Sequence, residues 1–277
     1  MAALAELHTP ETIEAELSYL ADTGERLVTR VAAPGGLDQR LGANSSETHR
    51  VRVHNGRPLA DDFVFERDGF RFVPHQSAVR NFCDEDEIRR VYYPECEALI
   101  KQVSGAKRVV VFDHTLRTAS AARREREKIR DIVSRVHNDY TEWSGPQRVR
   151  DIMGEEAESL LQGRFAIIQV WRPINHPVES HPLAICDAQT VRPETLVVNE
   201  RRYQDRVGQT YAITWDPGQR WYWFPKMRPD EALVFKVYES MRDGRARWTA
   251  HTAFADPGAP PSARPRESIE IRTLAFF

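Results

Sequence analysis

Short apolar runs separated by turn residues dominate the chain from residue 164 to its C-terminus. Each run is rich in β-branched and aromatic residues, and Pro, Gly and Asp occupy the gaps between runs. Many short strands of this kind are typical of a β-sandwich, a jelly roll or a barrel. The runs that we expect to form strands are RFAIIQVWRP, PLAICDA, ETLVVNE, QTYAITWD, QRWYWFP, ALVFKVYE, RWTAHTAF and ESIEIRTLAFF.

Helical spacing of apolar residues predicts helices at three places in the first part of the chain. We expect one over residues 10–22, because a threonine and a proline stand where the N-cap and first turn would be. We expect another over residues 84–103, with Pro94 kinking or breaking it and Gly105 ending it. The last is expected over residues 144–161.

The segments between these helices have other patterns. Residues 33–46 are rich in turn-forming residues and are expected to be irregular. Residues 50–79 contain short extended pieces with Asn-Gly and Asp-Gly turns between them. Residues 107–113 predict a buried strand, and residues 118–135 predict either a solvated helix or a mobile segment.

Together these patterns predict one domain over residues 1–277. Residues 1–105 would form a helical or irregular N-terminal part, packed on a β-rich core formed by residues 106–277. The fold class expected from the pattern is mainly β with N-terminal helices.

Composition narrows the classes of function. The 41 acidic and 39 basic residues give a net charge of −2, and the isoelectric point is near 6.5. This balance argues against a nucleic-acid-binding surface, which needs a basic excess. No apolar run approaches the ~18 residues of a membrane span, and the N-terminus lacks the pattern of a signal peptide. Cys83, Cys96 and Cys186 form no CxxC and are expected to be reduced thiols. We expect a soluble, cytoplasmic protein.

A His-x-Asp pair provides the first candidate chemistry. His137 and Asp139 are two residues apart in VHNDYT, so on an extended chain both side chains point to the same face. His251, within the expected strand RWTAHTAF, is the best candidate for a third ligand. Two histidines and one carboxylate on one face of a metal form the facial triad of non-haem Fe(II) oxygenases. The pair alone is short enough to arise by chance, and a surface histidine beside a turn aspartate is the plainer alternative.

An Arg-x-Ser pair opens the last expected strand. Arg266 and Ser268 share a strand face, and a guanidinium with a hydroxyl is a good clamp for a carboxylate. The alternative is an edge-strand arginine in a surface ion pair. Arg272 is expected on the same strand face but about 20 Å from Arg266, outside the clamp.

Three longer strings resemble the CmcJ/NvfI-like oxygenase family, which is named for the cephamycin-pathway 7α-hydroxylase component and a fungal meroterpenoid endoperoxide-forming enzyme. The resemblance extends from about residue 50 to the C-terminus. The strings are RFAIIQVWRPINHPVESHPLAICDA, QRWYWFPKMRPDEALVFKVYES and HTAFADPGAPPSARPRESIEIRTLAF.

The resemblance implies a double-stranded β-helix (a cupin-like jelly roll), Fe(II), 2-oxoglutarate as cosubstrate, and O₂. It assigns iron binding to His137, Asp139 and His251, and the 5-carboxylate of 2-oxoglutarate to Arg266 and Ser268. The whole chain would then be a single oxygenase domain. Gln169 is a departure, because the family is expected to have Asn more often at this position before VWRP. An amide contact from Gln169 to the cosubstrate is therefore an open question.

Four other residues are weaker site candidates. Arg172 could add a positive charge to the cosubstrate pocket, or it could pair with an acidic neighbour. Trp171, Trp221 and Trp223 are expected to be mostly core residues, of which one or two line the substrate pocket.

The expected function is oxidation of a small molecule by an Fe(II)/2-oxoglutarate-dependent dioxygenase in natural-product metabolism. The outcome could be hydroxylation, desaturation, or formation of a ring or peroxide. The expected partners are a small-molecule substrate and a second copy of the chain in a homodimer, with neither nucleic acid nor membrane. A jelly-roll metal- or ligand-binding protein without oxygenase activity, with zinc on the same three residues or no metal, is the alternative. A zinc hydrolase would need a further general base, which no residue pattern indicates.

Overall fold

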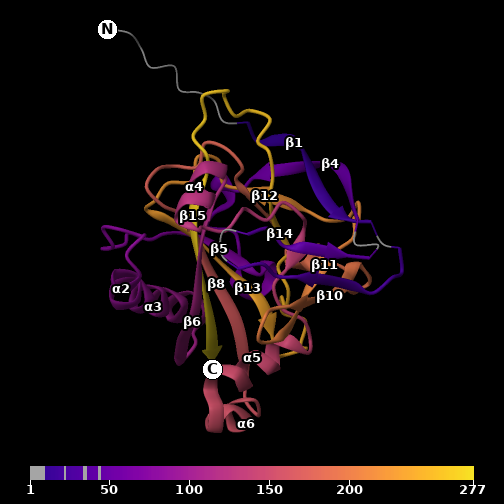
Figure 1. Ribbon diagram of the computed structural model, residues 1–277. Coiled ribbons are helices and arrows are strands. Elements are labelled where there is room, and N and C mark those ends of the chain that lie inside the picture. The colour runs from indigo at the N-terminus through magenta and orange to yellow at the C-terminus, as the bar shows by residue number, and fades with distance from the viewer. Residues whose placement is uncertain (1–9, 22, 34–35, 43–44) are drawn as a thin grey trace.

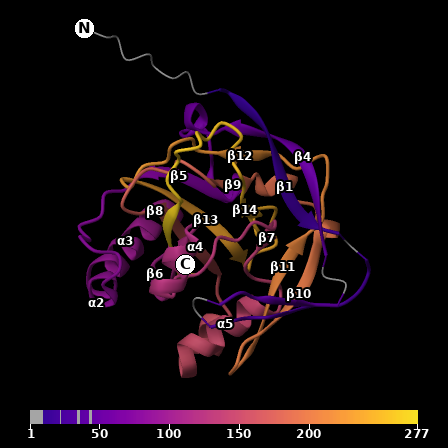
Figure 2. The same ribbon diagram turned by 45° about the horizontal axis from the view of Figure 1, so that its top comes forward.

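The computed structural model describes residues 10–277 except residues 22, 34, 35, 43 and 44. Two β-sheets make up the fold, one of ten strands and one of five, and they are seen from two directions in Figures 1 and 2. The ten-stranded sheet has the order β1 (Thr12–Leu20), β4 (Ser46–Asn55), β12 (Trp221–Trp223), β9 (Leu183–Cys186), β14 (His251–Ala253), β7 (His137–Asn138), β11 (Val207–Ile213), β10 (Leu196–Arg202), β2 (Leu27–Arg30) and β3 (Gln39–Leu41). The five-stranded sheet has the order β5 (Phe70–Pro74), β13 (Glu231–Glu239), β8 (Phe165–Pro173), β15 (Glu267–Phe276) and β6 (Arg108–Thr118).

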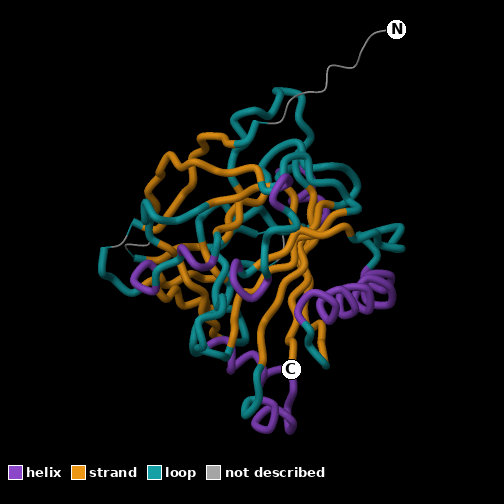
Figure 3. The backbone as a smooth tube through the Cα atoms, turned by 180° about the vertical axis from the view of Figure 1, so that it is seen from behind, coloured by secondary structure: helices purple, strands orange, loops and turns teal. Residues whose placement is uncertain are grey.

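Helices are short and lie at the sides of the sheets (Figure 3). They are η1 (Arg57–Leu59), α1 (Phe65–Asp68), α2 (Glu85–Glu87), the π-helical turn η2 (Ile88–Tyr92), α3 (Tyr93–Ser104), α4 (Ala121–Glu127), α5 (Ser144–Met153), η3 (Gly154–Glu156), α6 (Ala157–Leu160), η4 (Ala188–Thr190) and η5 (Pro193–Thr195).

All the strands expected after residue 164 are confirmed, as β8 to β15. The helix expected over residues 10–22 is wrong, because the described part of this segment contains strand β1. Ala15, Leu17 and Tyr19 are buried while Glu14 and Glu16 are exposed, which is the two-residue period of a strand. β1 pairs antiparallel with β4 along its whole length, so the N-terminal part adds strands, not a helix, to the sheet.

The other expected helices form with interruptions. Residues 84–103 divide into α2, η2 and α3, and Pro94 lies in the first turn of α3, where its missing N–H costs nothing. Gly105 ends α3 in the left-handed conformation, as expected. The segment 144–161 breaks at Gly154, whose φ is +54°.

The edge position of β6 changes one expectation. The strand expected over residues 107–113 is longer, and it is only partly buried because β6 forms an edge of the five-stranded sheet. Residues 118–135 contain the short helix α4, which has no buried residue, so the solvated-helix alternative is confirmed for residues 121–127. Residues 33–46 contain the short strand β3. The single domain over residues 1–277 and its division near residue 105 stay predictions, although β4 and β5 pair with the later strands β12 and β13.

The two faces of the five-stranded sheet have different partners. In β8, Ile168 and Val170 point to the face that α3 covers, where they form a core cluster with Cys96 and Leu99. Trp171 points to the opposite face, which packs against residues of the ten-stranded sheet. Alternate residues of each strand in this sheet therefore lie either beneath α3 or between the two sheets.

A further apolar cluster lies inside the curl of the ten-stranded sheet. Bridges join Ser18 to Arg135 and Leu20 to Thr214, so β1 returns to the segments beside β7 and β11. Figure 2 shows this strand arching over the sheet. The cluster contains Trp221 and Trp223, together with residues of β1, β4 and β9.

A buried lysine links β13 to the chain segments around it. Lys236 is 0% exposed, and its Nζ donates to Glu66 Oε2 at 2.7 Å and to Glu239 Oε2 at 3.0 Å. Arg164 also donates to both carboxylates. This network holds α1 and the end of β13 together next to the loop that leads to β14.

We expect Lys236→Met to lower the free energy of unfolding by about 3 kcal/mol, because removing one partner of a buried ion pair leaves the other charge without compensation. Arg164 still donates to both carboxylates in this variant, so the loss of unfolding free energy should be no larger. Urea unfolding followed by circular dichroism measures it, with Lys101→Met, which changes an exposed lysine of α3, as the control. A Lys236→Met protein as stable as the control variant would contradict the role of this network.

Candidate active site

His137, Asp139 and His251 come together between the two sheets. β7 and β14 are neighbours, and His137 lies opposite His251 in the antiparallel register, with ring centroids 4.3 Å apart. Asp139 follows directly after β7. The potential ligand atoms of all three residues lie within 4.8 Å of one another. The structure therefore assembles the set that the sequence predicted.

The main chain orients both histidine rings. Nδ1 of His137 lies 2.8 Å from the carbonyl oxygen of Arg135, and Nδ1 of His251 lies 3.0 Å from that of Thr249. A carbonyl oxygen can only accept, so each Nδ1 carries the proton and donates it. Each Nε2 then keeps a lone pair. In His251 this atom is buried and has no hydrogen-bond partner among the described residues, as expected of a metal ligand.

Electrostatics also suit a metal ion. Burial, followed by the neighbouring His251, lowers the pKa of His137 to about 3, so this ring is neutral near pH 7. Burial alone would raise the pKa of the Asp139 carboxyl, but Arg272 and the two histidines hold it well below its usual range. One ionised carboxylate and a neutral imidazole with a free lone pair are the forms that bind divalent metals.

The second carboxylate oxygen of Asp139 is occupied by protein donors. Gln169 Nε2 donates to Asp139 Oδ2 at 2.6 Å, and Arg272 Nε donates to the same oxygen at 3.3 Å. The other oxygen, Oδ1, faces Nε2 of His137 at 3.5 Å. Arg272, which the sequence placed outside the clamp of Arg266 and Ser268, thus contacts a carboxylate of the metal-binding candidates. The amide nitrogen of Gln169 serves a metal-site carboxylate, while its Oε1 is buried without a partner among the described residues.

Arg266 and Ser268 form a second polar group with unused hydrogen-bonding capacity. Arg266 is 2% exposed, and Nη1 donates to the carbonyl oxygen of His181 at 2.9 Å. Its Nε and the hydroxyl of Ser268 are buried and have no partner in the part of the chain that the structure describes. Burial, followed by the nearby Arg117, lowers the pKa of Arg266 to about 9. A bound carboxylate would satisfy these donors.

The aromatic and basic candidates divide between different regions. Trp171 lies beneath the Arg266 guanidinium, 5.4 Å from its ring centroid. Trp221 and Trp223 lie instead in the cluster inside the curl of the ten-stranded sheet. Arg172 points to the α3 face, where Nη1 lies 3.2 Å from Nδ1 of His75. Arg172 directly follows Trp171 on β8, and neighbouring residues of a strand point to opposite faces. The structure therefore does not bring Arg172 to the metal-binding candidates.

Arg117 and Arg272 were not among the sequence candidates. Arg117 lies opposite Ser268 in the register of β6 and β15, and its Nη1 donates to the Asp131 carbonyl oxygen at 2.9 Å. The two-residue period of β15 places Arg272 on the face of Ser268, but only the packing of the two sheets reveals that it reaches Asp139.

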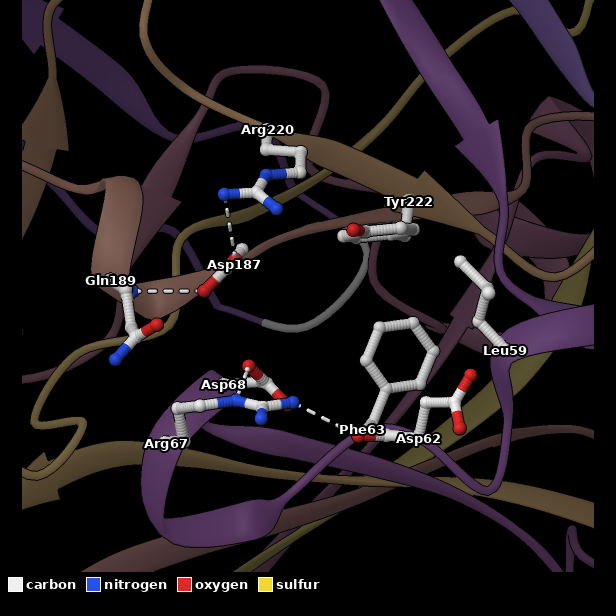
Figure 4. Close-up of a pocket in the computed structure, with 9 residues that line it drawn as sticks. All are labelled: Leu59, Asp62, Phe63, Arg67, Asp68, Asp187, Gln189, Arg220 and Tyr222. Atoms are coloured by element: carbon white, nitrogen blue, oxygen red, sulfur yellow. Dashed lines mark hydrogen bonds and ion pairs between the residues drawn. The ribbon is translucent and has the colours of Figure 1, made fainter.

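A separate surface pocket of about 270 Å³ lies beside η1, α1 and β12 (Figure 4). Its charged residues largely pair with one another. Arg67 pairs with Asp68 at 2.8 Å, and Arg220 lies 3.6 Å from Asp187. The metal-binding candidates do not line it, so this pocket is distinct from the site between the sheets.

Comparisons with known proteins place this geometry in a family. A sequence model described as "Oxidoreductase/YMDC permease-like domain" matches residues 17–276. The chain is 34% identical to the Fe(II)/2-oxoglutarate-dependent dioxygenase nvfI of Aspergillus novofumigatus, covering 95% of this chain and 96% of the relative. It is 32% identical to the alpha-ketoglutarate-dependent dioxygenase phiK of a fungal species, covering 96% of each.

The solved structure of the iron and alpha-ketoglutarate-dependent endoperoxidase NvfI superimposes with a TM-score of 0.84 at 30% identity, covering 97% of this chain and 99% of that one. The expected fold class, a mainly β jelly roll, is thereby confirmed, with the N-terminal helix replaced by β1. The resemblance noted in the sequence is also confirmed. This chain belongs to the family of Fe(II)/2-oxoglutarate-dependent dioxygenases that includes nvfI and phiK.

Proposed function

We propose that the protein oxidises a small molecule in natural-product metabolism as a non-haem Fe(II)/2-oxoglutarate-dependent dioxygenase. The observation that carries this proposal is the presence of two groups with unused binding capacity, both beside aromatic residues of the cluster between the two sheets. One is the set His137, Asp139 and His251, with ligand atoms within 4.8 Å. The other is the pair Arg266 and Ser268, with buried donors that lack partners among the described residues.

Each group has a separate task. His137 Nε2, His251 Nε2 and Asp139 Oδ1 would hold Fe(II), and three protein ligands leave the remaining positions for the cosubstrate and O₂. The iron with its 2-oxo acid supplies the redox chemistry. Arg266 and Ser268 would hold the 5-carboxylate of 2-oxoglutarate and so fix the direction from which the cosubstrate reaches the metal.

Aromatic residues of β13 and β8 form part of the walls of the site, next to the polar Gln169. The Phe235 ring lies 4.8 Å from the His251 ring, and Trp171 lies against Arg266. Such walls exclude water and strengthen the charged contacts within. A structural zinc site would explain the three metal-binding candidates but not the unpaired donors of Arg266 and Ser268, so the oxygenase is favoured over a metal-binding protein without activity.

The substrate outcome, the assembly and the location are finer parts of the proposal. Hydroxylation, desaturation, and ring or peroxide formation are all open to this chemistry, and the relative NvfI is named an endoperoxidase. We propose a homodimer in the cytoplasm that binds neither nucleic acid nor membrane; sedimentation velocity tests the assembly. Cys83, Cys96 and Cys186 are free thiols, which supports a reducing compartment. In the described part of the chain, no helix is long and apolar enough to cross a membrane.

The metal assignment predicts that Asp139→Ala abolishes Fe(II) binding and 2-oxoglutarate turnover, because it removes the only carboxylate of the three candidates. In the wild-type protein, Mn(II) as a redox-inert substitute should raise the melting temperature, since a ligand that binds only the folded state stabilises it. Differential scanning fluorimetry and metal analysis measure both effects. The assignment fails if Asp139→Ala keeps the wild-type metal content and the Mn(II) shift.

The clamp assignment predicts that Arg266→Ala weakens 2-oxoglutarate binding on the order of a hundredfold or more, because losing one partner of a buried charge pair costs about 3–5 kcal/mol. Affinity for Fe(II) alone should stay within a few fold. Anaerobic titration of 2-oxoglutarate into the Fe(II) protein measures the change.

Arg172→Ala is the matched control, because Arg172 is also a buried arginine of the five-stranded sheet but lies on the α3 face. We expect it to leave 2-oxoglutarate affinity within about twofold of the wild type. If Arg172→Ala lost its affinity for 2-oxoglutarate while Arg266→Ala kept it, the clamp would have to be assigned to Arg172 instead of Arg266.

A further inference from the structure

We propose that Gln169 and Arg272 are positioning residues that restrict Asp139 to a single oxygen for the metal. The inference rests on the proposed function, since it concerns the same metal site. It starts from the unequal surroundings of the two carboxylate oxygens. Oδ2 accepts from Gln169 Nε2 at 2.6 Å and from Arg272 Nε at 3.3 Å, whereas Oδ1 faces His137.

A carboxylate can bind a metal through one oxygen or two. Binding through both would occupy a position that the cosubstrate or O₂ needs, because a facial triad works by leaving three positions open. Two donors directed at Oδ2 use the lone pairs of that oxygen, so Oδ1 is the oxygen left for the metal. Hydrogen bonds from outside the metal ligands fix ligand orientation in this way in other metal sites.

The position of Gln169 suits this task. It is fully buried in the middle of β8, with Arg272 opposite it on β15 and Phe235 opposite it on β13. Neighbouring strands therefore hold its backbone on both sides, and its amide is directed toward Asp139. A neutral amide donates to the carboxylate without adding a charge that would compete with the metal.

Arg272 is held in turn by its own partners. It pairs with Glu270, and its Nη1 donates to Thr115 Oγ1 at 2.8 Å and to Asp113 Oδ2 at 3.1 Å. These partners lie on β15 and β6, so the guanidinium is fixed to the five-stranded sheet before it reaches Asp139. The proposed cosubstrate clamp, formed by Arg266 just before β15 and Ser268 within it, thus stands at the start of the strand that carries Arg272 further along.

The test uses Gln169→Leu and Arg272→Met, which each remove the group that donates to Asp139 Oδ2. We expect Fe(II) affinity, measured by competition with a chelator, to fall about 10- to 100-fold. Co(II) is the second probe, because its visible absorption changes with the number of ligands and requires no turnover. Its spectrum in both variants should differ from that of the wild type. The conservative variants Gln169→Asn and Arg272→Lys should have Fe(II) affinities between those of the wild type and the variants without the donor. A merely structural role would not produce this graded order.

Arg57→Gln is the control for loss of an arginine ion pair elsewhere. Arg57 binds Glu231 through two hydrogen bonds of 2.9 and 2.8 Å, away from the metal residues, so metal affinity and the Co(II) spectrum should be unchanged. Wild-type Fe(II) affinity and Co(II) spectra in Gln169→Leu and Arg272→Met would overturn the proposal. If either protein fails to fold by circular dichroism, the same outcome in its conservative variant overturns it. A wild-type protein that binds neither Fe(II) nor 2-oxoglutarate would instead refute the proposed function.

Discussion

The Asp139 side chain is only 14% exposed between the two sheets, and this near-burial of its carboxylate is the constraint on which the candidate site depends. A carboxylate in such a place needs compensating charge and hydrogen bonds, or it takes up a proton. Arg272 supplies the charge and Gln169 supplies a hydrogen bond, and both come from the sheet opposite β7. The contact between the sheets is therefore polar at this point and apolar around it, where Phe235 and Trp171 close the region.

This arrangement divides the chemistry between the two sheets. The ten-stranded sheet carries His137 and His251 on paired strands, while the proposed carboxylate clamp stands at the start of β15, with Arg266 just before this strand and Ser268 within it. The position of the proposed clamp relative to the metal-binding candidates therefore depends on how the two sheets pack, and an apolar cluster with residues from both sheets lies between them. Buried charges such as Lys236 contribute by fixing β13, which supplies Phe235 beside His251, one of the metal-binding candidates.

The features that the sequence predicted correctly are those that depend on a short stretch of consecutive residues. The strands after residue 164 and the spacing of His137 and Asp139 could be identified because each is written in a few consecutive residues. The segment that forms β1 carries two conflicting signals: a helix N-cap at its start, and the alternation of Ala15, Leu17 and Tyr19 with polar residues, which is the period that the structure follows.

Arg172 and Arg272 differ in how much of their surroundings could be predicted from the sequence. The parity of residues on β8 could have excluded Arg172 from the face of Trp171, because neighbours on a strand point in opposite directions. The contact of Arg272 with Asp139 could not be predicted, because parity gives the face of a sheet but not what packs against that face.

The hydrogen bonds that orient His137 and His251 have a consequence for the history of such sites. Their acceptors are carbonyl oxygens of residues two positions earlier, and every amino acid has a carbonyl oxygen. Substitution at residue 135 or 249 therefore changes a side chain without removing the acceptor. Proteins that evolve from this fold can therefore vary the residues around the substrate while both imidazoles keep their tautomer and orientation. New reactions can then arise without changes to the candidate metal site.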